Sequence, residues 1–257
     1  MLPILPGPAV CENEIVLEGE NLLALYVIGD LHLSLGADKP MDVFYGWEDY
    51  VQRIEANWKN TIADEDTVVL AGDSSWAMSI ENTLEDFRFI HQLPGQKWLL
   101  KGNHDYWWST KSKMEAFLSQ NGLTSLHILH NNAVEVDGMA VCGTRGWMFE
   151  KGANPDKKIV SREAGRLEAS IRDADRFGAV EKVAFLHYPP VYGNDITPAI
   201  VDVLLRNNIR RCFYGHIHGA GCRYAIDGVY LGIDFRLISS DYLDFQPVRV
   251  EPARLKA

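Results

Sequence analysis

Short apolar runs recur along this chain, and each one stops at a glycine or a polar residue. Runs of this length predict buried strands. The longer ones cover 22–28, 67–71, 97–100, 182–186 and 211–214. Shorter ones, at 126–129, 133–136, 139–142, 229–233 and 236–238, predict further strands.

The segments between these runs place apolar residues three or four positions apart, the spacing of a helix with one buried face. The predicted helices cover 47–62, 79–91, 111–120, 161–177 and 197–207. Ser161 and Thr197 are the predicted caps of the last two, and Pro198 suits a first helical position. Strands that alternate with helices predict an α/β layered fold. We expect two central sheets flanked by helices, with the polar strand ends gathered at one edge.

The composition limits the number of domains and the kinds of partner that the chain can have. The chain has 257 residues, 47% of them hydrophobic, and no Pro/Gly/Ser-rich linker divides it, so we expect a single domain over 1–257. Its formal net charge is -10, and no Lys/Arg-rich run is present. This argues against a nucleic-acid-binding surface, which usually needs a basic stripe. An anionic substrate stays compatible with the charge, because bound metal ions reverse the local field.

The first fourteen residues and the cysteines point to a cytoplasmic protein. The apolar beginning, MLPILPGPAVCENE, is short, broken by prolines and free of Lys and Arg, so we expect neither a signal peptide nor a membrane span in it. The cysteines show no CxxC spacing and predict reduced thiols rather than disulfides or a zinc site. They are Cys11, Cys142, Cys212 and Cys222.

Five of the predicted strands end in side chains that can bind a metal ion. These side chains are Asp30 and His32, then Asp73, then Asn103 and His104, then His187, then His216 and His218. Taken singly, a Gly-Asp pair after a strand is usually a turn, and a buried His is usually a hydrogen-bonded core residue. Ligands in open α/β sheets bind at the carboxyl ends of the strands. The repetition of carboxylate, imidazole and amide groups in this one context predicts a metal centre.

The number and type of these ligands favour two ions. Mixed nitrogen and oxygen ligands suit Mn, Fe or Zn better than Ca or Mg, and we expect Mn. Seven protein ligands with one shared carboxylate fit two ions about 3.5–4 Å apart. Such a pair clamps a phosphoryl oxygen and lowers the pKa of a bridging water, so that hydroxide attacks phosphorus in line. His104 is then left as a general acid for the leaving oxygen.

The order of the motifs, GDLH, GD, GNHD, H and GHIH, resembles the calcineurin-like metallophosphoesterase superfamily. The stretches SSWAM, LPGQKWLLKGNHDYWW and GTRGW further resemble a bacterial branch of predicted phosphohydrolases. The resemblance implies a four-layer αββα sandwich with two central mixed sheets. It also divides the ligands between the ions. One would be held by Asp30, His32 and His218, the other by Asn103, His187 and His216, with Asp73 bridging both.

By the same resemblance, His104 would be the general acid or a phosphate donor, with Asp105 orienting it. The sequence departs from the protein-phosphatase branch, which has GD-x-x-DR and GNHE. Here Ser74-Ser75-Trp76-Ala77 follows Asp73, and the tetrad ends in Asp105. The phosphate-binding Arg of that branch is missing, which argues against phosphoprotein substrates.

Other side chains are candidates for contact with the substrate. Arg145, between two glycines, offers a guanidinium that suits phosphate, and a solvated loop Arg is the equal alternative. Asn103 is a candidate substrate contact as well as a ligand. We expect Arg162 and Arg166 to lie on a solvated helix face. The aromatic residues 106–108 could line the site, with at least one of them packed in the core instead.

These observations favour a dinuclear metal-dependent hydrolase of a phosphomonoester or phosphodiester, with a small molecule or a nucleotide as the substrate. A nuclease of the same superfamily is the first alternative, although the lack of basic tracts weighs against it. A non-catalytic metal-binding scaffold is the second, and such a protein would be expected to have lost His104 or a ligand. The loops 34–46 and 143–159 are candidate specificity segments.

Overall fold

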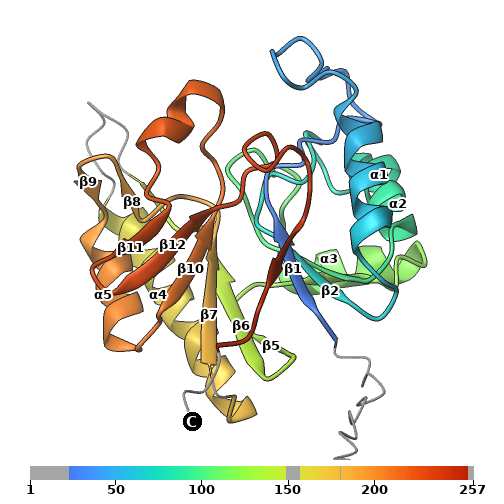
Figure 1. Cartoon of the computed structure of the whole chain (residues 1–257). Helices are drawn as coiled ribbons and strands as arrows, with labels where there is room; N and C mark the ends of the chain where they lie inside the picture. Colours follow the sequence, from blue (N-terminus) through green and yellow to red (C-terminus); the bar gives the residue numbers. More distant parts are fainter. Residues whose placement is uncertain (1–22, 149–156, 180, 254–257) are drawn as a thin grey trace, which may run out of the picture.

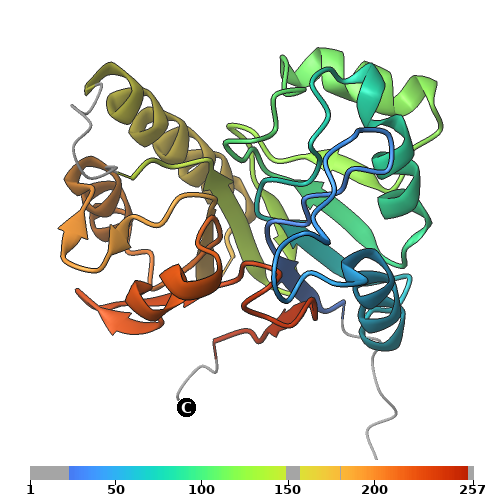
Figure 2. The ribbon, with the colours of Figure 1, turned by 90° about the horizontal axis from the view of Figure 1, so that it is seen from above.

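The computed structural model describes residues 23–148, 157–179 and 181–253. Two mixed sheets stand face to face, and helices cover the outer face of each (Figures 1 and 2). The predicted four-layer αββα sandwich with two central mixed sheets is therefore confirmed. The assignment of one domain to 1–257 includes residues outside the described ranges and stays a prediction, as does everything inferred from the first fourteen residues.

The first sheet has the order β13-β1-β2-β3-β4, with β1 to β4 parallel and β13 antiparallel to β1. Its strands are β1 (Leu25–Ile28), β2 (Thr67–Leu70), β3 (Gln96–Leu99), β4 (Leu126–Ile128) and β13 (Val248–Val250). The helices on its outer face are α1 (Tyr50–Thr61), α2 (Leu84–Gln92) and α3 (Lys111–Gln120), with the 3-10 turn η1 (Glu81–Thr83) leading into α2.

The second sheet has the order β11-β12-β10-β7-β6-β5, in which the four inner strands are parallel and both edge strands antiparallel. Its strands are β5 (Val134–Val136), β6 (Met139–Thr144), β7 (Glu181–Leu186), β10 (Arg211–Tyr214), β11 (Gly228–Tyr230) and β12 (Ile233–Leu237). Helices α4 (Lys157–Ala174) and α5 (Pro198–Arg206) cover it. The remaining elements are the 3-10 turns η2 (Asp175–Phe177) and η3 (Gly219–Tyr224) and the hairpin of β8 (Val191–Tyr192) and β9 (Asp195–Ile196).

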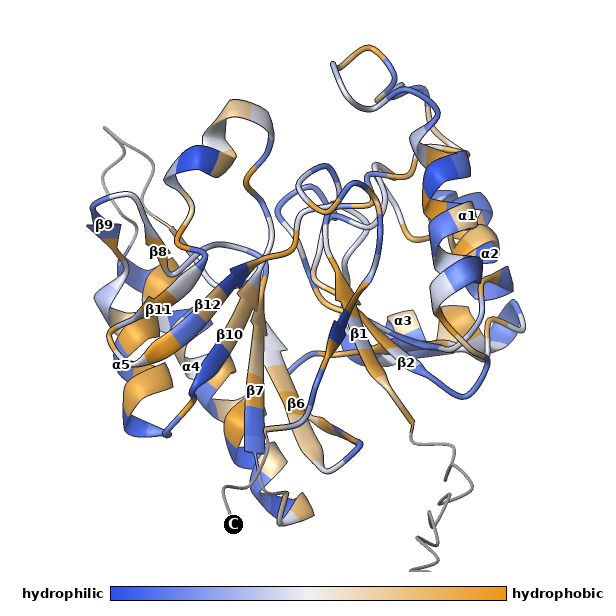
Figure 3. Cartoon of the chain, viewed as in Figure 1, coloured by the Kyte–Doolittle hydropathy of each residue, from blue (hydrophilic) through white to orange (hydrophobic). Residues whose placement is uncertain are grey.

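Apolar side chains fill three layers of this sandwich. One cluster joins the first sheet to α1–α3, one joins the second sheet to α4 and α5, and the third lies between the two sheets. In the central layer the rings of Phe185 and Phe213 stack at 5.2 Å, beside fully buried Leu25 and Val27. The inner strands are therefore apolar on both faces, as their colours in Figure 3 show, and this explains why they appear in the sequence as continuous apolar runs.

Several predicted boundaries were wrong. The helix expected to begin after a cap at Ser161 already includes Lys157. The two last predicted strands are divided differently, because Leu231 and Gly232, with φ of 52° and 77°, form a turn between β11 and β12. Strand β13 and the β8–β9 hairpin were not predicted, since two or three residues show no periodicity.

The two sheets are joined where β1 ends. The Gly29 N–H donates to the Ile238 carbonyl at 2.7 Å, and the Gly29 carbonyl accepts from the Ser240 N–H at 3.1 Å. Cys142 and Cys212 are buried free thiols and Cys222 is a partly buried one, whereas Cys11 lies outside the described residues. Burial raises the pKa of Cys142 to about 12. No helix in the described ranges is long and apolar enough to cross a membrane.

Candidate metal centre

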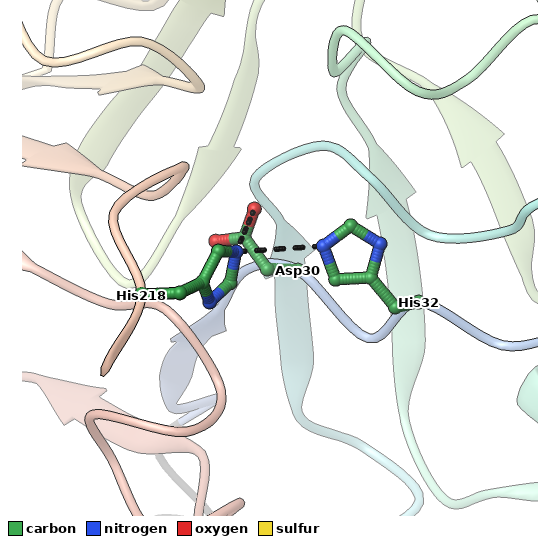
Figure 4. Close-up of side chains that lie close together, drawn as sticks. All are labelled: Asp30, His32 and His218. Carbon is green, nitrogen blue, oxygen red and sulfur yellow. Dashed lines mark hydrogen bonds and ion pairs between the residues drawn. The ribbon is translucent and has the colours of Figure 1, made fainter. Parts of the chain in front are cut away.

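The predicted ligands lie in the loops that follow β1, β2, β3, β7 and β10, at one edge of the sandwich. Figure 2 looks down onto these strand ends. They come from both sheets, so the site lies at the seam between them. Figure 4 shows Asp30 and His32, from the loop after β1, facing His218, from the loop after β10.

Asp30, His32 and His218 form a compact group whose ligand atoms all lie within 4.8 Å of one another. The Nε2 atoms of His32 and His218 are 3.4 Å apart, and His218 Nε2 is 3.7 Å from Asp30 Oδ1 (Figure 4). The structure therefore brings together the three residues expected at the first metal site.

A second group joins Asp30, Asp73 and His187 within the same 4.8 Å limit. His187 Nε2 is 3.5 Å from Asp73 Oδ2 and 2.6 Å from Asn103 Oδ1, while its Nδ1 is 3.1 Å from the Ala71 carbonyl oxygen. A ring nitrogen next to a backbone carbonyl carries the proton, which leaves Nε2 as the ligand atom. Asp73 Oδ2 also lies 3.8 Å from His32 Nε2, so this carboxylate stands between the two groups.

His216, expected at the second site, lies beside these groups without joining either. Its ring centroid is 5.1 Å from that of His187 and 4.3 Å from that of Tyr188. Its backbone N–H donates to both oxygens of the Asp30 carboxylate, at 3.1 and 2.9 Å. The structure thus places His216 next to the second group and uses its backbone to hold Asp30.

Four of these residues adopt left-handed backbone conformations, which are uncommon outside glycine. The φ angles are 59° at Asp30, 48° at His32, 50° at Asp73 and 73° at His216. Strain of this kind costs about 1–3 kcal/mol per residue and clusters at functional sites. Cross-loop hydrogen bonds hold it in place: the Asp30 N–H donates to the Gly72 carbonyl and the His32 N–H to the Asp73 carbonyl, each at 2.9 Å.

Two glycines of the motifs are needed for space. A Cβ on Gly102 would lie 2.0 Å from Asp73 Oδ1, and a Cβ on Gly215 would lie 2.3 Å from Asp30 Oδ2. The missing side chain of Gly102 thus lets the loop after β3 approach the Asp73 carboxylate.

Asp105 ties two ligand loops together. Its buried carboxylate accepts hydrogen bonds from the backbone N–H groups of Gly102 at 2.7 Å and Asp73 at 2.9 Å, and from Trp107 Nε1 at 3.0 Å. The His104 N–H in turn donates to Asp73 Oδ1 at 2.7 Å. Through these bonds Asp105 sets the position of His104 by way of the backbone.

Burial dominates the electrostatics of the site. It raises the pKa of Asp30 to about 6 and also raises that of Asp73, which Asp105 and Asp30 raise further. It lowers the pKa of His187 and brings that of His216 to about 4. Neutral imidazoles are the form that binds metal, and a cation between the two carboxylates would relieve their repulsion.

The donor set fits first-row transition metals: two carboxylates, imidazoles and one amide oxygen. In the described part of the chain the buried Nδ1 of His32 has no hydrogen-bond partner, while its Nε2 faces Asp73 and His218. The unpaired nitrogen is not the one that faces the cluster, so the case for a bound metal rests on the donor set and not on this atom.

Sequence reasoning missed two residues that shape the site. Asp241 Oδ1 is 2.7 Å from His218 Nδ1, and its Oδ2 accepts the Gly219 N–H at 2.8 Å. Burial has the largest single effect on the pKa of His218 and lowers it, but the hydrogen bond to Asp241 and the negative charges of Asp30 and Asp241 together outweigh burial, so the pKa is raised overall. Trp76 stacks on His32 at 5.0 Å and lies 4.4 Å from the His104 ring. SSWAM was recognised only as a family signature, and no spacing pointed to Asp241.

The other candidates have mixed outcomes. Trp107 is buried in the core, as expected of at least one of the three aromatics, whereas Tyr106 is exposed and its hydroxyl lies 3.4 Å from His104 Nδ1. Arg162 is exposed, as predicted. Arg166 is not simply solvated, because its guanidinium lies 2.6 Å from buried Glu163.

The protein is thus of the αββα sandwich class, with a cluster of carboxylates and imidazoles at its strand ends that could hold metal ions. The family model for the calcineurin-like phosphoesterases matches residues 23–220. The chain therefore belongs to the calcineurin-like phosphoesterase family. No match was found among curated proteins.

Three solved structures resemble the chain. A phosphopantetheinyl hydrolase from Mycobacterium tuberculosis is 15% identical, with a TM-score of 0.51, over 92% of this chain and 98% of that one. A protein of unknown function from Aquifex aeolicus is 17% identical (TM-score 0.45), over 88% of this chain and 95% of that one. The protein TT1561 of Thermus thermophilus is 13% identical (TM-score 0.49), over 77% and 83%. The first of these supports the shared fold.

Proposed function

We propose that the protein hydrolyses a phosphomonoester or phosphodiester of a small molecule or nucleotide with the help of two metal ions. The observation that carries the proposal is the position of Asp73. Its carboxylate lies 3.8 Å from His32 Nε2 in one ligand group and 3.5 Å from His187 Nε2 in the other. Burial lowers the pKa of both His32 and His187, and a carboxylate between two such imidazoles is suited to bridging a pair of ions.

The proposed division of the residues between the two ions is the one that the resemblance to the family implies. Asp30, His32 and His218 would hold one ion, Asn103, His187 and His216 the other, and Asp73 both. The donor set favours Mn, with Fe or Zn as alternatives. When bound, such a pair polarises the phosphoryl group and lowers the pKa of a water to near neutrality.

His104 is the proposed proton donor to the leaving oxygen. Burial lowers its pKa, and His218 and Lys39 lower it further. The imidazole of the free protein is therefore mostly neutral at pH 7. A phosphate dianion beside it would favour the charged form, so substrate binding itself would load the proton that His104 later donates.

Asn103 and Arg145 are the proposed contacts to phosphate groups of the substrate. Since Asn103 Oδ1 faces His187, the amide nitrogen points away from that ring and can donate to an oxygen of the substrate. The carbonyl of Arg145 accepts the N–H groups of His187 at 3.1 Å and Tyr188 at 2.8 Å, which keeps this residue next to a proposed ligand.

The test is hydrolysis of p-nitrophenyl phosphate and bis-p-nitrophenyl phosphate by metal-stripped protein reloaded with Mn, Fe, Zn or Mg. We expect metal-dependent turnover that Asp73→Asn and His104→Ala both abolish, and that Glu55→Gln, an exposed change on α1, leaves intact. The ratio of the two rates distinguishes monoesterase from diesterase. Turnover without metal would contradict the proposal. Two bound ions without turnover would favour a binding scaffold.

A further inference from the structure

Three basic side chains gather beside the metal centre, on the side where β3 and β6 end. Lys101 follows β3 and stands two residues before Asn103. Arg145 follows β6, and its backbone is hydrogen-bonded to that of His187. Arg166 reaches the same place from α4, so the cluster draws on both sheets and on the helix layer outside the second.

A buried acid organises the two arginines. Glu163 Oε1 lies 3.2 Å from Arg145 Nη2 and 2.6 Å from Arg166 Nη1, and the Thr144 hydroxyl donates to Glu163 Oε2 at 2.9 Å. The Glu163 side chain is 1% exposed, whereas those of Arg145 and Arg166 are 18% and 31% exposed. The carboxylate therefore holds the guanidinium groups from behind and leaves part of each open to solvent.

The cluster carries more positive than negative charge. Among the described residues, one carboxylate stands against three cations, and the next acid, Asp105, is already engaged by backbone N–H groups. Leu100, next to Lys101, packs against the end of β6: its Cδ1 lies 2.7 Å from where a Cβ on Gly143 would stand, so Lys101 and Arg145 follow neighbouring strand ends. In a chain of net charge -10, such a local excess is unusual. An anion would offset it.

Arginine is suited to this task, because its planar fork binds phosphate with two parallel hydrogen bonds, while lysine adds a compact point charge. Arg145 also lies over the Trp147 ring, with Cζ 5.2 Å from the centroid, which fixes the plane of the fork.

We infer that Lys101, Arg145 and Arg166 form a second anion site, which takes a second phosphate group of a substrate whose scissile phosphate lies at the metal centre. The inference rests on the proposed function and narrows the substrate to a bisphosphate or a diphosphate ester. The alternative is a purely structural ion-pair network that attaches α4 to β6.

The first test compares adenosine 3′,5′-bisphosphate with adenosine 5′-monophosphate, which share a nucleoside and differ by one phosphate. In the metal-loaded protein we expect kcat/KM to be about 10-fold higher for the bisphosphate, the effect of one or two charge-assisted hydrogen bonds. Arg166→Gln and Lys101→Gln should each lower this ratio toward 1. The control Arg172→Gln, on the exposed face of the same helix, should leave it unchanged. Thermal melting would verify that each variant folds.

The second test needs no turnover. Inorganic pyrophosphate is titrated calorimetrically into protein kept metal-free with EDTA. We expect binding that Arg166→Gln weakens by about 10-fold and Arg172→Gln does not. If p-nitrophenyl phosphate is hydrolysed but the bisphosphate has no advantage, or Arg166→Gln does not reduce it, the inference is wrong and the proposed function stands. If no ester is hydrolysed with any metal, the proposed function fails, and pyrophosphate binding alone decides whether the anion site exists.

Discussion

The two sheets contribute different chemistry to the metal centre. Loops of the first sheet bring the carboxylates of Asp30 and Asp73 and the amide of Asn103, with His32 as their single imidazole among the predicted ligands. Loops of the second bring imidazoles only, from His187, His216 and His218. Negative charge thus comes mainly from one half and neutral nitrogen from the other. Neither half alone holds all the proposed ligands, so we expect metal binding to depend on how the sheets pack.

The two halves also position their ligands differently. In the first, Asp30, His32 and Asp73 occupy left-handed backbone positions held by hydrogen bonds between adjacent loops. In the second, His216 is also left-handed, but His218 is oriented by a side chain from farther along the chain, Asp241. The first half therefore positions its ligands mainly through the backbone, whereas the second half adds a contact between side chains.

We expect the largest effect on turnover from removal of the Asp73 charge, which lies between ligands from the two halves. Asp73→Asn keeps the shape of the side chain and removes the carboxylate that lies between His32 of one ligand group and His187 of the other. We expect turnover of the best metal-loaded form to fall by at least about 10³-fold, the upper range for loss of one electrostatic contact to a reacting group. Metal content per chain, measured by mass spectrometry, should fall as well. Asp137→Asn, in the β5–β6 turn, is the matched control. Wild-type turnover in Asp73→Asn would show that the halves do not share a ligand.

Cavities made in two different layers should separate the effect of packing on stability from its effect on metal binding. Leu25→Ala opens a cavity in the central layer, and Ile54→Ala opens one between α1 and the first sheet; both side chains are fully buried. Each change should lower the free energy of unfolding by about 2–5 kcal/mol, measured in urea. Only Leu25→Ala should also weaken Mn binding, because only that cavity lies between the two sheets whose loops carry the proposed ligands. Equal losses of Mn affinity in both variants would contradict a site assembled by sheet packing.

Much of this architecture could be predicted because its signals are local. The runs that became β1, β2, β3, β7 and β10 are apolar on both faces, and each is followed at once by a polar group. The signals that failed depend on contacts across the chain. Asp241 comes after the last strand of the second sheet, and only the fold shows that it meets His218. The need for Gly102 likewise depends on Asp73, 29 residues earlier, whose carboxylate occupies the space of a Cβ.

The basic cluster could not be predicted from the sequence for the same reason. Its members, Lys101, Arg145 and Arg166, are far apart in sequence and do not belong to a basic run. Glu163 and Arg166, three positions apart on α4, could suggest an ordinary surface pair. Only the burial of Glu163 and its second partner, Arg145, show that this pair belongs to a cluster at the site.

Loss of the contact between Asp241 and His218 should have a smaller effect than loss of the Asp73 carboxylate. Asp241→Asn removes the negative charge behind His218 while keeping its shape. Loss of such an outer partner typically costs 10–100-fold in metal affinity, so we expect a fall of about that size in Mn affinity by calorimetry. Asp202→Asn, exposed on α5, is the control. An unchanged Mn affinity in Asp241→Asn would mean that His218 is positioned by its loop, as the ligands of the first half are.

The smallest predicted effect lies in β3, away from the strand ends. Lys97 is fully buried, its ammonium donates to the Leu93 carbonyl and the Ser125 hydroxyl, and burial lowers its pKa to about 8. Its ordinary pKa is 10.5, so between these values the unfolded chain binds more protons than the folded one, and this group makes stability rise with pH.

From pH 7.5 to 9 the gain should be about 1 kcal/mol. Urea unfolding of wild type and Lys97→Met at both pH values isolates it, because the methionine does not titrate while every other group is shared. The stability of wild type relative to the variant should increase by that amount between the two conditions. A difference that stays constant would mean that the carbonyl and hydroxyl groups around Lys97 stabilise its charge as well as water does. In that case burial would not disfavour the charged form of Lys97 at the start of β3. Beside the other end of the strand, by contrast, burial disfavours the charged form of Asp73 and raises its pKa.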